Sequence, residues 1–260
     1  MDSSNRMPAV FVGHGSPMNT LEQNRWTESW ADLGRALPRP RAIVAISAHW
    51  YINATAVTAM AEPSTIHDFF GFPEELFAVQ YGAPGSPELA HEIAEVAKPT
   101  WVGLDRDSWG FDHGTWSVLT HMYPEADVPV VQLSVDAGKP AHYHVDLGAK
   151  LAPLRDDGVL FVASGNVLHN LAMMDPSRPD TAFAWGEAYD EAATELMTVR
   201  PGDIATLYEH EHHHLAAPTP DHLLPVFYVA GMAAEAGATA EVFTDGYLMG
   251  SLSMTSYLLR

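Results

Sequence analysis

The sequence contains no cysteine, few basic residues and no long apolar run. Without cysteine, disulfides, zinc-thiolate sites, iron–sulfur clusters and cysteine nucleophiles are excluded, so histidine, aspartate or glutamate must hold any metal. Only 13 basic residues stand against 33 acidic ones, which gives a formal net charge of −20. Nucleic acid and anionic membrane surfaces are therefore poor partners, because both are bound through a basic face.

Membrane insertion is also disfavoured by the apolar runs of the chain. The longest of them, such as Pro129–Leu133, have the length of a strand and fall far short of the roughly 20 residues that span a bilayer. Residues 1–15 lack the basic start and the long apolar stretch of a signal peptide. We therefore expect a cytoplasmic protein without a membrane partner, either a monomer or a small homo-oligomer.

Short runs rich in valine and isoleucine, bounded by proline, glycine or polar residues, predict strands. They are Ala9–Val12, Ala42–Ser47, Thr55–Met60, Val128–Ser134 and Val159–Ser164. Segments with helical spacing lie between and after them, namely Thr20–Ala36, Ser86–Ala97, Thr115–Met122, Ala141–Leu154, Thr181–Val199 and Asp221–Ala236. This alternation predicts an α/β fold, with one domain over residues 1–260 and a mostly parallel central sheet flanked by helices.

Three of the 14 histidines follow predicted strands. They are His14 in Gly13–Pro17, His49 in Ser47–Trp50 and His169 in Ser164–Asn170. Parallel sheets bind ligands beyond the carboxyl ends of their strands, so these three side chains are expected at one edge of the sheet. Converging imidazoles suit zinc, iron, copper or nickel, and the pattern predicts a metal site there.

Two more histidines are candidates for the same site. His222 stands at the start of a predicted helix that prolines precede; it either joins the site or is exposed while Asp221 caps the helix. His113 directly precedes another helix. It either donates a hydrogen bond to bound substrate or dioxygen, or belongs to a capping turn.

Two segments allow two interpretations each. His67–Pro73 is an aromatic loop that contains Gly71, and it is either a lid over a flat ring or a loop pinned to the core by its phenylalanines. In the run Glu209–His214, the side chains of His210, His213 and His214 share a face if the segment is helical and can then chelate a metal. A run of this kind is more often a solvated surface segment.

Motifs of other enzyme classes are missing. The chain has no Walker A loop, no G-x-G-x-x-G, no H-E-x-x-H and no G-x-S-x-G. Ser16 and Ser164 lie near histidines but without a nucleophile elbow, which disfavours a serine hydrolase.

Taken in order, segments along the whole chain resemble the DOPA 4,5-dioxygenase group of class III extradiol ring-cleavage dioxygenases, relatives of the protocatechuate 4,5-dioxygenase catalytic subunit. The matching stretches are 13–17, 47–50, 67–73, 81–85, 112–116, 122–124, 129–134, 165–171, 221–225 and 250–254. The resemblance implies a single-domain α/β fold and a mononuclear non-haem metal, normally Fe(II), with Zn(II) also found. It implies a catechol, DOPA-like, and O2 as substrates.

The resemblance also implies roles for the histidines. His14 and His49 fall on metal ligands, and His222 falls where the wider superfamily has a third ligand, often a glutamate. His169 falls on a further ligand or the acid/base, and His113 falls on an active-site histidine near dioxygen and substrate. The expected site is therefore His14, His49, His169 and His222 for metal, with His113 and His169 as catalytic residues.

Two departures from the family pattern affect the metal and the substrate. With His222 in place of an acid, the all-histidine site suits zinc at least as well as iron. The family's usual His-Pro pair before Asp221 is Ala217-Pro218 here, which predicts either a substrate other than DOPA or compensation by His214. Two other functions stay open: a zinc hydrolase or lyase, and a metal-binding protein without enzymatic activity.

Overall fold

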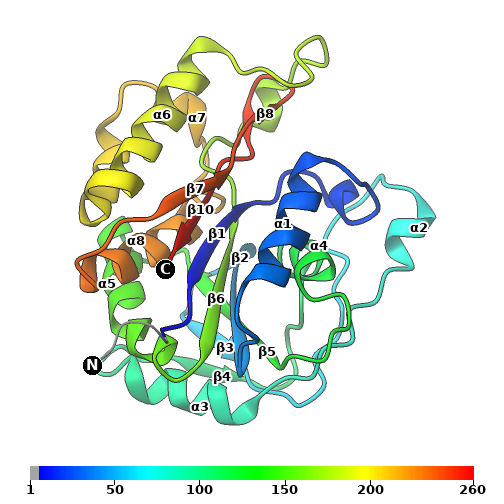
Figure 1. Ribbon diagram of the computed structural model, residues 1–260, viewed down its shortest axis with the longest axis vertical. Helices are drawn as coiled ribbons and strands as arrows, with labels where there is room; N and C mark the ends of the chain where they lie inside the picture. Colours follow the sequence, from blue (N-terminus) through cyan, green and yellow to red (C-terminus); the bar gives the residue numbers. More distant parts are fainter. Residues whose placement is uncertain (1–5) are drawn as a thin grey trace.

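The structure, a computed structural model, describes residues 6–260. The first five residues, which belong to the N-terminal segment and the domain range considered above, lie outside the described part. An eight-stranded sheet forms the centre, in the order β4-β3-β5-β2-β6-β1-β10-β7 (Figure 1). Its strands are β1 (Ala9–Gly13), β2 (Ala42–Ile52), β3 (Ala56–Thr58), β4 (Gly103–Asp105), β5 (Val130–Asp136), β6 (Val159–Gly165), β7 (Glu241–Thr244) and β10 (Ser256–Leu259). A small hairpin joins β8 (Tyr247–Leu248) to β9 (Leu252–Ser253).

The middle of the sheet is parallel, as the sequence predicts. Strand β6 pairs in parallel with both β1 and β2, and β2 pairs in parallel with β5. Every residue of β1, β5 and β6 is buried, which is the pattern of strands covered on both faces. Antiparallel pairing occurs toward the two sides, between β3 and β5, β1 and β10, and β10 and β7.

Helices cover both faces of the sheet (Figure 1). They are α1 (Arg25–Ala36), α2 (Glu74–Phe77), α3 (Pro87–Val96), α4 (His113–Met122), α5 (Ala141–Leu151), α6 (Ala184–Val199), α7 (His213–Ala216) and α8 (Leu224–Glu235). Short 3-10 turns are η2 (Pro17–Thr20), η3 (Ala152–Arg155), η4 (Leu171–Met173) and η5 (Pro201–Glu209). One core contains α3, α5, α6 and α8, and the other contains α1 and α4. Alternate strand residues such as Phe11 and Val12 enter opposite cores.

Two predicted boundaries differ most from the structure, each for a local reason. Helix α1 begins at Arg25 rather than Thr20, because the Asn24 side chain caps it by accepting hydrogen bonds from the backbone N–H groups of Trp26 and Thr27, both at 3.1 Å. Strand β2 continues past Ser47 to Ile52, so His49 lies inside the strand instead of after it. The pairing of β2 with β5 shifts register between Ile46 and Tyr51, and this irregularity surrounds His49.

Other elements were not predicted, among them β4, the β8–β9 hairpin, the C-terminal strands β7 and β10 and the four-residue helix α2. Within residues 6–260, no helix is both long and apolar enough to cross a membrane.

Candidate active site

All five candidate histidines line one pocket of about 430 Å³. They come from five places in the fold: His14 follows β1, His49 lies in β2, His113 begins α4, His169 lies in the loop after β6, and His222 lies two residues before α8. The carboxyl ends of β1, β2 and β6 thus deliver three of them to one edge of the sheet. The first turn of α4 and the entry to α8 bring the other two.

The ring nitrogens of His14, His49 and His113 lie within 4.8 Å of one another. The two Nε2 atoms of His14 and His49 are 3.3 Å apart. The ring centre of His222 is 5.3 Å from that of His14 and 4.9 Å from that of His49. His169 stacks on His222: the two rings are parallel, and their centres lie 3.5 Å apart.

Ser164 fixes which nitrogen of His14 carries the proton. The Ser164 hydroxyl donates its only proton to the carbonyl of Gly114 at 2.6 Å. Its contact with His14 Nδ1 at 2.8 Å must therefore be a hydrogen bond that Nδ1–H donates. The Nε2 atom of His14 then has a free lone pair.

Asp68 orients two histidines at once. One carboxylate oxygen accepts hydrogen bonds from the Nδ1 and the backbone N–H of His113, both at 2.9 Å. The other oxygen lies 3.1 Å from Nδ1 of His49. Burial acts to raise the pKa of Asp68, but the hydrogen bonds to His113 and His49 outweigh it and hold that pKa below its ordinary value. An ionised carboxylate only accepts, so both histidines keep a proton on Nδ1 and, in the neutral form, direct an unprotonated Nε2 elsewhere.

Asp221 acts on His222 in the same way. Its carboxylate accepts a hydrogen bond from Nδ1 of His222. Asp221 is therefore not the cap of α8, whose N-cap residue is Leu223, and His222 is only 7% exposed. Carboxylates that hold the outer nitrogen of an imidazole are the usual companions of metal-binding histidines.

Burial keeps most of these imidazoles neutral. It lowers the pKa of His222 to about 4 and that of His169 to about 2, and it lowers the pKa of His14 and His113. His49 differs: burial lowers its pKa, but Asp68 and the charge of Asp112 outweigh this and leave it raised. Neutral imidazole is the form that binds metals.

These residues fit a metal ion. With the proton of each ring on Nδ1, the Nε2 atoms of His14 and His49 face each other 3.3 Å apart as two acceptors without a proton between them. A cation relieves that repulsion, and 3.3 Å is close to the spacing of two neighbouring ligands that each lie about 2.1 Å from one ion. The donor set is nitrogen-rich and contains no thiolate, which suits iron or zinc.

Comparison with known proteins agrees with this site. Residues 8–259 match the family model of the catalytic LigB subunit of aromatic ring-opening dioxygenase. The chain is 49% identical to 4,5-DOPA dioxygenase extradiol of Escherichia coli K12, over 98% of this chain and 95% of that protein. It is 36% identical to the protein of the same name from Beta vulgaris, over 95% and 94%. The crystal structure of uncharacterized protein JW3007 from Escherichia coli K12 superposes with a TM-score of 0.85 at 44% identity, covering 98% of this chain and all of that one.

The chain belongs to the LigB family. It is an aromatic ring-opening dioxygenase, and the metal dependence of such enzymes agrees with the histidine cluster. The predictions of family, α/β fold and ring-opening activity are confirmed. For this LigB enzyme, the open alternatives of a zinc hydrolase and a protein without enzymatic activity are not supported.

The wall of the LigB pocket beyond the histidines is mostly apolar. Phe69 and Phe72 pack edge to face with ring centres 5.3 Å apart, and both contact the core, whereas Phe70 is 91% exposed. Gly71 has a φ of 79°, a conformation that glycine adopts without strain. The aromatic loop therefore combines both interpretations: two rings pin it to the core, and all three line the pocket.

The His210–His214 run does not form a second metal site. Within residues 6–260, the His14 group is the only set of three metal-binding side chains whose donor atoms lie this close together. His213 is buried, and its Nδ1 is 2.9 Å from the hydroxyl of Tyr189. His214 is exposed and does not line the pocket, so it does not stand in for the family's missing histidine.

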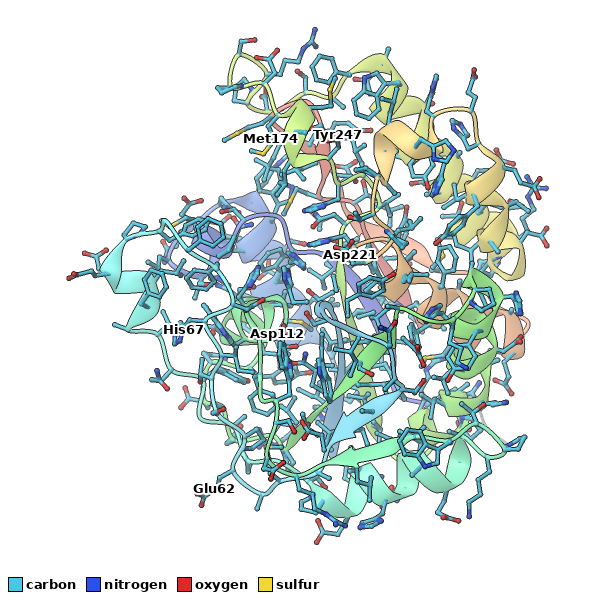
Figure 2. The ribbon with its side chains drawn as sticks, turned by 180° about the vertical axis from the view of Figure 1, so that it is seen from behind. Glu62, His67, Asp112, Met174, Asp221 and Tyr247 are labelled. Atoms are coloured by element: carbon cyan, nitrogen blue, oxygen red, sulfur yellow. The ribbon has the colours of Figure 1, made fainter. Side chains whose placement is uncertain are left out.

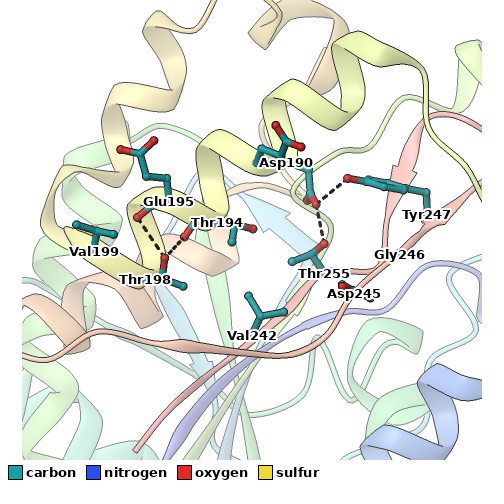
Figure 3. A pocket seen from close by; sticks show the side chains of 11 residues that line it. Asp190, Thr194, Glu195, Thr198, Val199, Val242, Asp245, Gly246, Tyr247 and Thr255 are labelled. Carbon is teal, nitrogen blue, oxygen red and sulfur yellow. Dashed lines mark hydrogen bonds between the residues drawn. The ribbon is translucent and has the colours of Figure 1, made fainter.

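A larger hollow of about 690 Å³ lies between α6 and β7, away from the histidines (Figure 3). Its buried Asp190 accepts hydrogen bonds from Ser253, Thr255 and Tyr247. Burial raises the pKa of Asp190 to about 6. This hollow offers carboxylates and threonine hydroxyls, and none of its lining residues is a histidine.

Sequence reasoning missed the residues that orient the histidines. Asp68 lies inside the aromatic loop, where only the rings were considered, and Asp221 was considered only as a helix cap. Their position directly next to or within histidine-containing segments, His67–Asp68 and Asp221–His222, was the available signal. Ser164 was noted near a histidine but only as a nucleophile.

Proposed function

We propose that this dioxygenase opens a catechol ring in the extradiol position at an iron(II) ion held by His14, His49 and His222. The observation that carries the proposal is the pair of facing Nε2 atoms of His14 and His49, 3.3 Å apart, in a pocket walled by aromatic side chains. Relatives named for 4,5-DOPA make DOPA the first catechol to test.

Ring spacing supports His222 as the third ligand. An imidazole bound through a nitrogen about 2.1 Å from an ion has its ring centre roughly 3.2 Å away, so three tetrahedrally arranged rings have centres about 5.2 Å apart. The separations among His14, His49 and His222 are 5.1, 5.3 and 4.9 Å. His113 is less even, at 5.7 Å from His14 and 3.8 Å from His49, although one of its ring nitrogens, rather than one of His222, completes the group whose donor atoms lie within 4.8 Å of one another.

We assign proton transfer to His113 and His169. His169 stacks on His222, and its ring has no hydrogen-bond partner within the described residues, so its nitrogens are free to accept a hydrogen bond from a catechol hydroxyl. His113 is held by Asp68 through Nδ1–H, which leaves Nε2 unprotonated, and its ring centre lies 3.8 Å from that of His49. Its Nε2 is placed to accept a proton from the catechol, and in the protonated form it donates a hydrogen bond to dioxygen or to the ring oxygen.

When bound, iron(II) supplies the redox coupling between catechol and dioxygen. The protein orients the ring by the aromatic wall, excludes water with Phe69 and Phe72, and holds each ligand nitrogen in its unprotonated form through Ser164, Asp68 and Asp221. Both oxygen atoms of O2 enter the product, a semialdehyde acid. We further propose that residues 1–260 act as one catalytic domain and that the enzyme is cytoplasmic.

Anaerobic reconstitution tests the proposal. Protein loaded with Fe(II) is given a catechol such as DOPA, and then oxygen. We expect a yellow semialdehyde and one O2 consumed per catechol with Fe(II), and neither with Zn(II), which has no accessible redox couple. Ring opening by a zinc-loaded sample free of iron would refute an iron-dependent reaction, and no oxygen uptake with any catechol would refute the substrate class.

A further inference from the structure

The pocket wall that would surround the substituent of a catechol contains no cationic side chain. Of the lining residues, all of which lie in the described part of the chain, none is lysine or arginine. Its apolar members include Phe69, Phe70, Phe72, Leu171, Met174 and Leu252. In Figure 2, Met174 lies above Asp221 and Asp112, toward the upper part of the molecule.

The charges nearest to this pocket are negative. Asp68 lines the pocket, and Asp221 lies directly behind His222. The hydrogen bonds of both to histidines keep these carboxylates ionised. The whole chain carries a formal charge of −20, which adds a repulsive field for anions at low salt. The charge of a bound metal is offset by the catechol oxygens themselves, so it leaves no partner for a second anionic group.

The basic residue nearest in sequence to Met174 is already occupied. Arg178 lies 3.6 Å from the carboxylate of Asp175 through Nε, and its Nη1 donates to the carbonyl of Ala182 at 3.4 Å. Its guanidinium stacks 4.7 Å above the ring of Phe183. A carboxylate with no ammonium group beside it would therefore lose water in the pocket without gaining a cationic partner, which is costly.

We propose that the site selects catechols whose substituent is uncharged or cationic and discriminates against anionic ones. This inference rests on the proposed ring-opening function and names the substrate class of that same site. An uncharged alkyl group packs on Leu171, Met174 and the phenylalanines. An ammonium group is stabilised by the aromatic faces and by the surrounding negative charge.

Matched catechols test the selection. 3,4-Dihydroxyphenylacetamide and 3,4-dihydroxyphenylacetate have side chains of nearly the same size, and only the second is anionic; dopamine adds a cationic substituent. Each is titrated calorimetrically into zinc-loaded protein without oxygen, which gives a Kd without turnover, and kcat/KM is then measured with Fe(II). We expect the anionic catechol to bind at least 10-fold more weakly than the uncharged amide. Its kcat/KM should rise with salt, because salt screens the repulsion.

A variant at the exposed mouth provides the second test. Leu171→Lys places a cation beside the substituent and should reduce the 10-fold difference to about threefold or less. Leu171→Gln, a neutral polar control, should leave the ratio between the two catechols as it is. Equal shifts in both variants would overturn the electrostatic explanation.

The two proposals fail in different ways. Equal or tighter binding of 3,4-dihydroxyphenylacetate overturns the inference and leaves ring opening intact. If iron-loaded protein opens no catechol while the calorimetric preference holds, the proposed function is wrong and the selectivity of the pocket stands. Binding of none of the three catechols overturns both.

Discussion

Two groups of histidines in this chain have opposite distributions in sequence and in space. His14, His49, His113, His169 and His222 are spread over more than 200 residues and meet in one pocket. Four histidines in the run 210–214 are almost contiguous, yet they point in different directions. His213 is buried against Tyr189, while the side chain of His214 is exposed.

The difference lies in what holds the outer nitrogen of each ring. In the pocket, Ser164, Asp68 and Asp221 fix the proton on Nδ1 and leave Nε2 free. In the run, no carboxylate from the edge of the sheet contacts a histidine within the described residues. His213 uses its Nδ1 for a hydrogen bond with the hydroxyl of Tyr189. A metal site thus depends on strand ends and acceptors behind the ligands rather than on local histidine density.

The largest effect on metal binding is expected when one pocket histidine is removed. His14→Ala or His49→Ala should reduce bound metal to less than one-tenth of an equivalent and abolish ring opening, because each supplies one of the two facing nitrogens. Metal content is measured by elemental analysis after dialysis. His214→Ala, the matched control from the run, should keep full metal. Unchanged stoichiometry in the His14 or His49 variant would contradict their role.

The next test separates ligands from proton-transfer residues inside the pocket. His222→Ala should lose metal, whereas His113→Ala should keep it and lose turnover by a factor of about 10² to 10⁴. Metal content and kcat are measured on the same samples. The reverse pattern, with metal lost from the His113 variant and kept by the His222 variant, would make His113 the third ligand.

A smaller effect is expected from the residues behind the ligands. Asp68→Asn replaces a carboxylate that serves both His49 and His113, and should weaken metal affinity about 10- to 100-fold. Ser164→Ala removes one neutral hydrogen bond to His14 and should weaken metal affinity less than Asp68→Asn does. Competition with a chelator measures both affinities. A larger loss in the serine variant than in the aspartate variant would show that charge behind the ligands is not decisive.

Much of the fold could be predicted from the sequence, because buried parallel strands are short apolar runs with clear boundaries. All five predicted strands exist, and Pro225 lies in the first turn of α8. The late strands β7 and β10 were missed because they pair antiparallel and their register depends on distant partners. The start of α1 was missed because a side-chain cap at Asn24 overrode the helical spacing upstream.

The site was predictable in its members but not in its arrangement. Strand ends brought His14, His49 and His169 to attention, the predicted helix starts added His113 and His222, and the resemblance implied a role for each. Sequence could not show that one carboxylate, Asp68, would serve two rings, since the loop that carries it lies far from both histidines along the chain. Nor could it show that His169 stacks on His222, which depends on the path of two separate loops.

The smallest effect is expected from a histidine of the 210–214 run, where a substitution should change stability and leave metal binding intact. His213→Ala removes the hydrogen bond with Tyr189 and a buried ring, so it should lower the free energy of unfolding by about 1–3 kcal/mol while metal content stays full. Burial lowers the pKa of His213, and the charges of His214 and His210 add to this. Because the folded pKa lies below the unfolded value of about 6.5, the contribution of His213 is complete above pH 6.5 and is lost as the pH falls below it. Urea unfolding at pH 7.5 and 5.5 should therefore show a larger difference between wild type and variant at the higher pH. A loss of metal in this variant, with stability unchanged, would mean that the run does participate in metal binding.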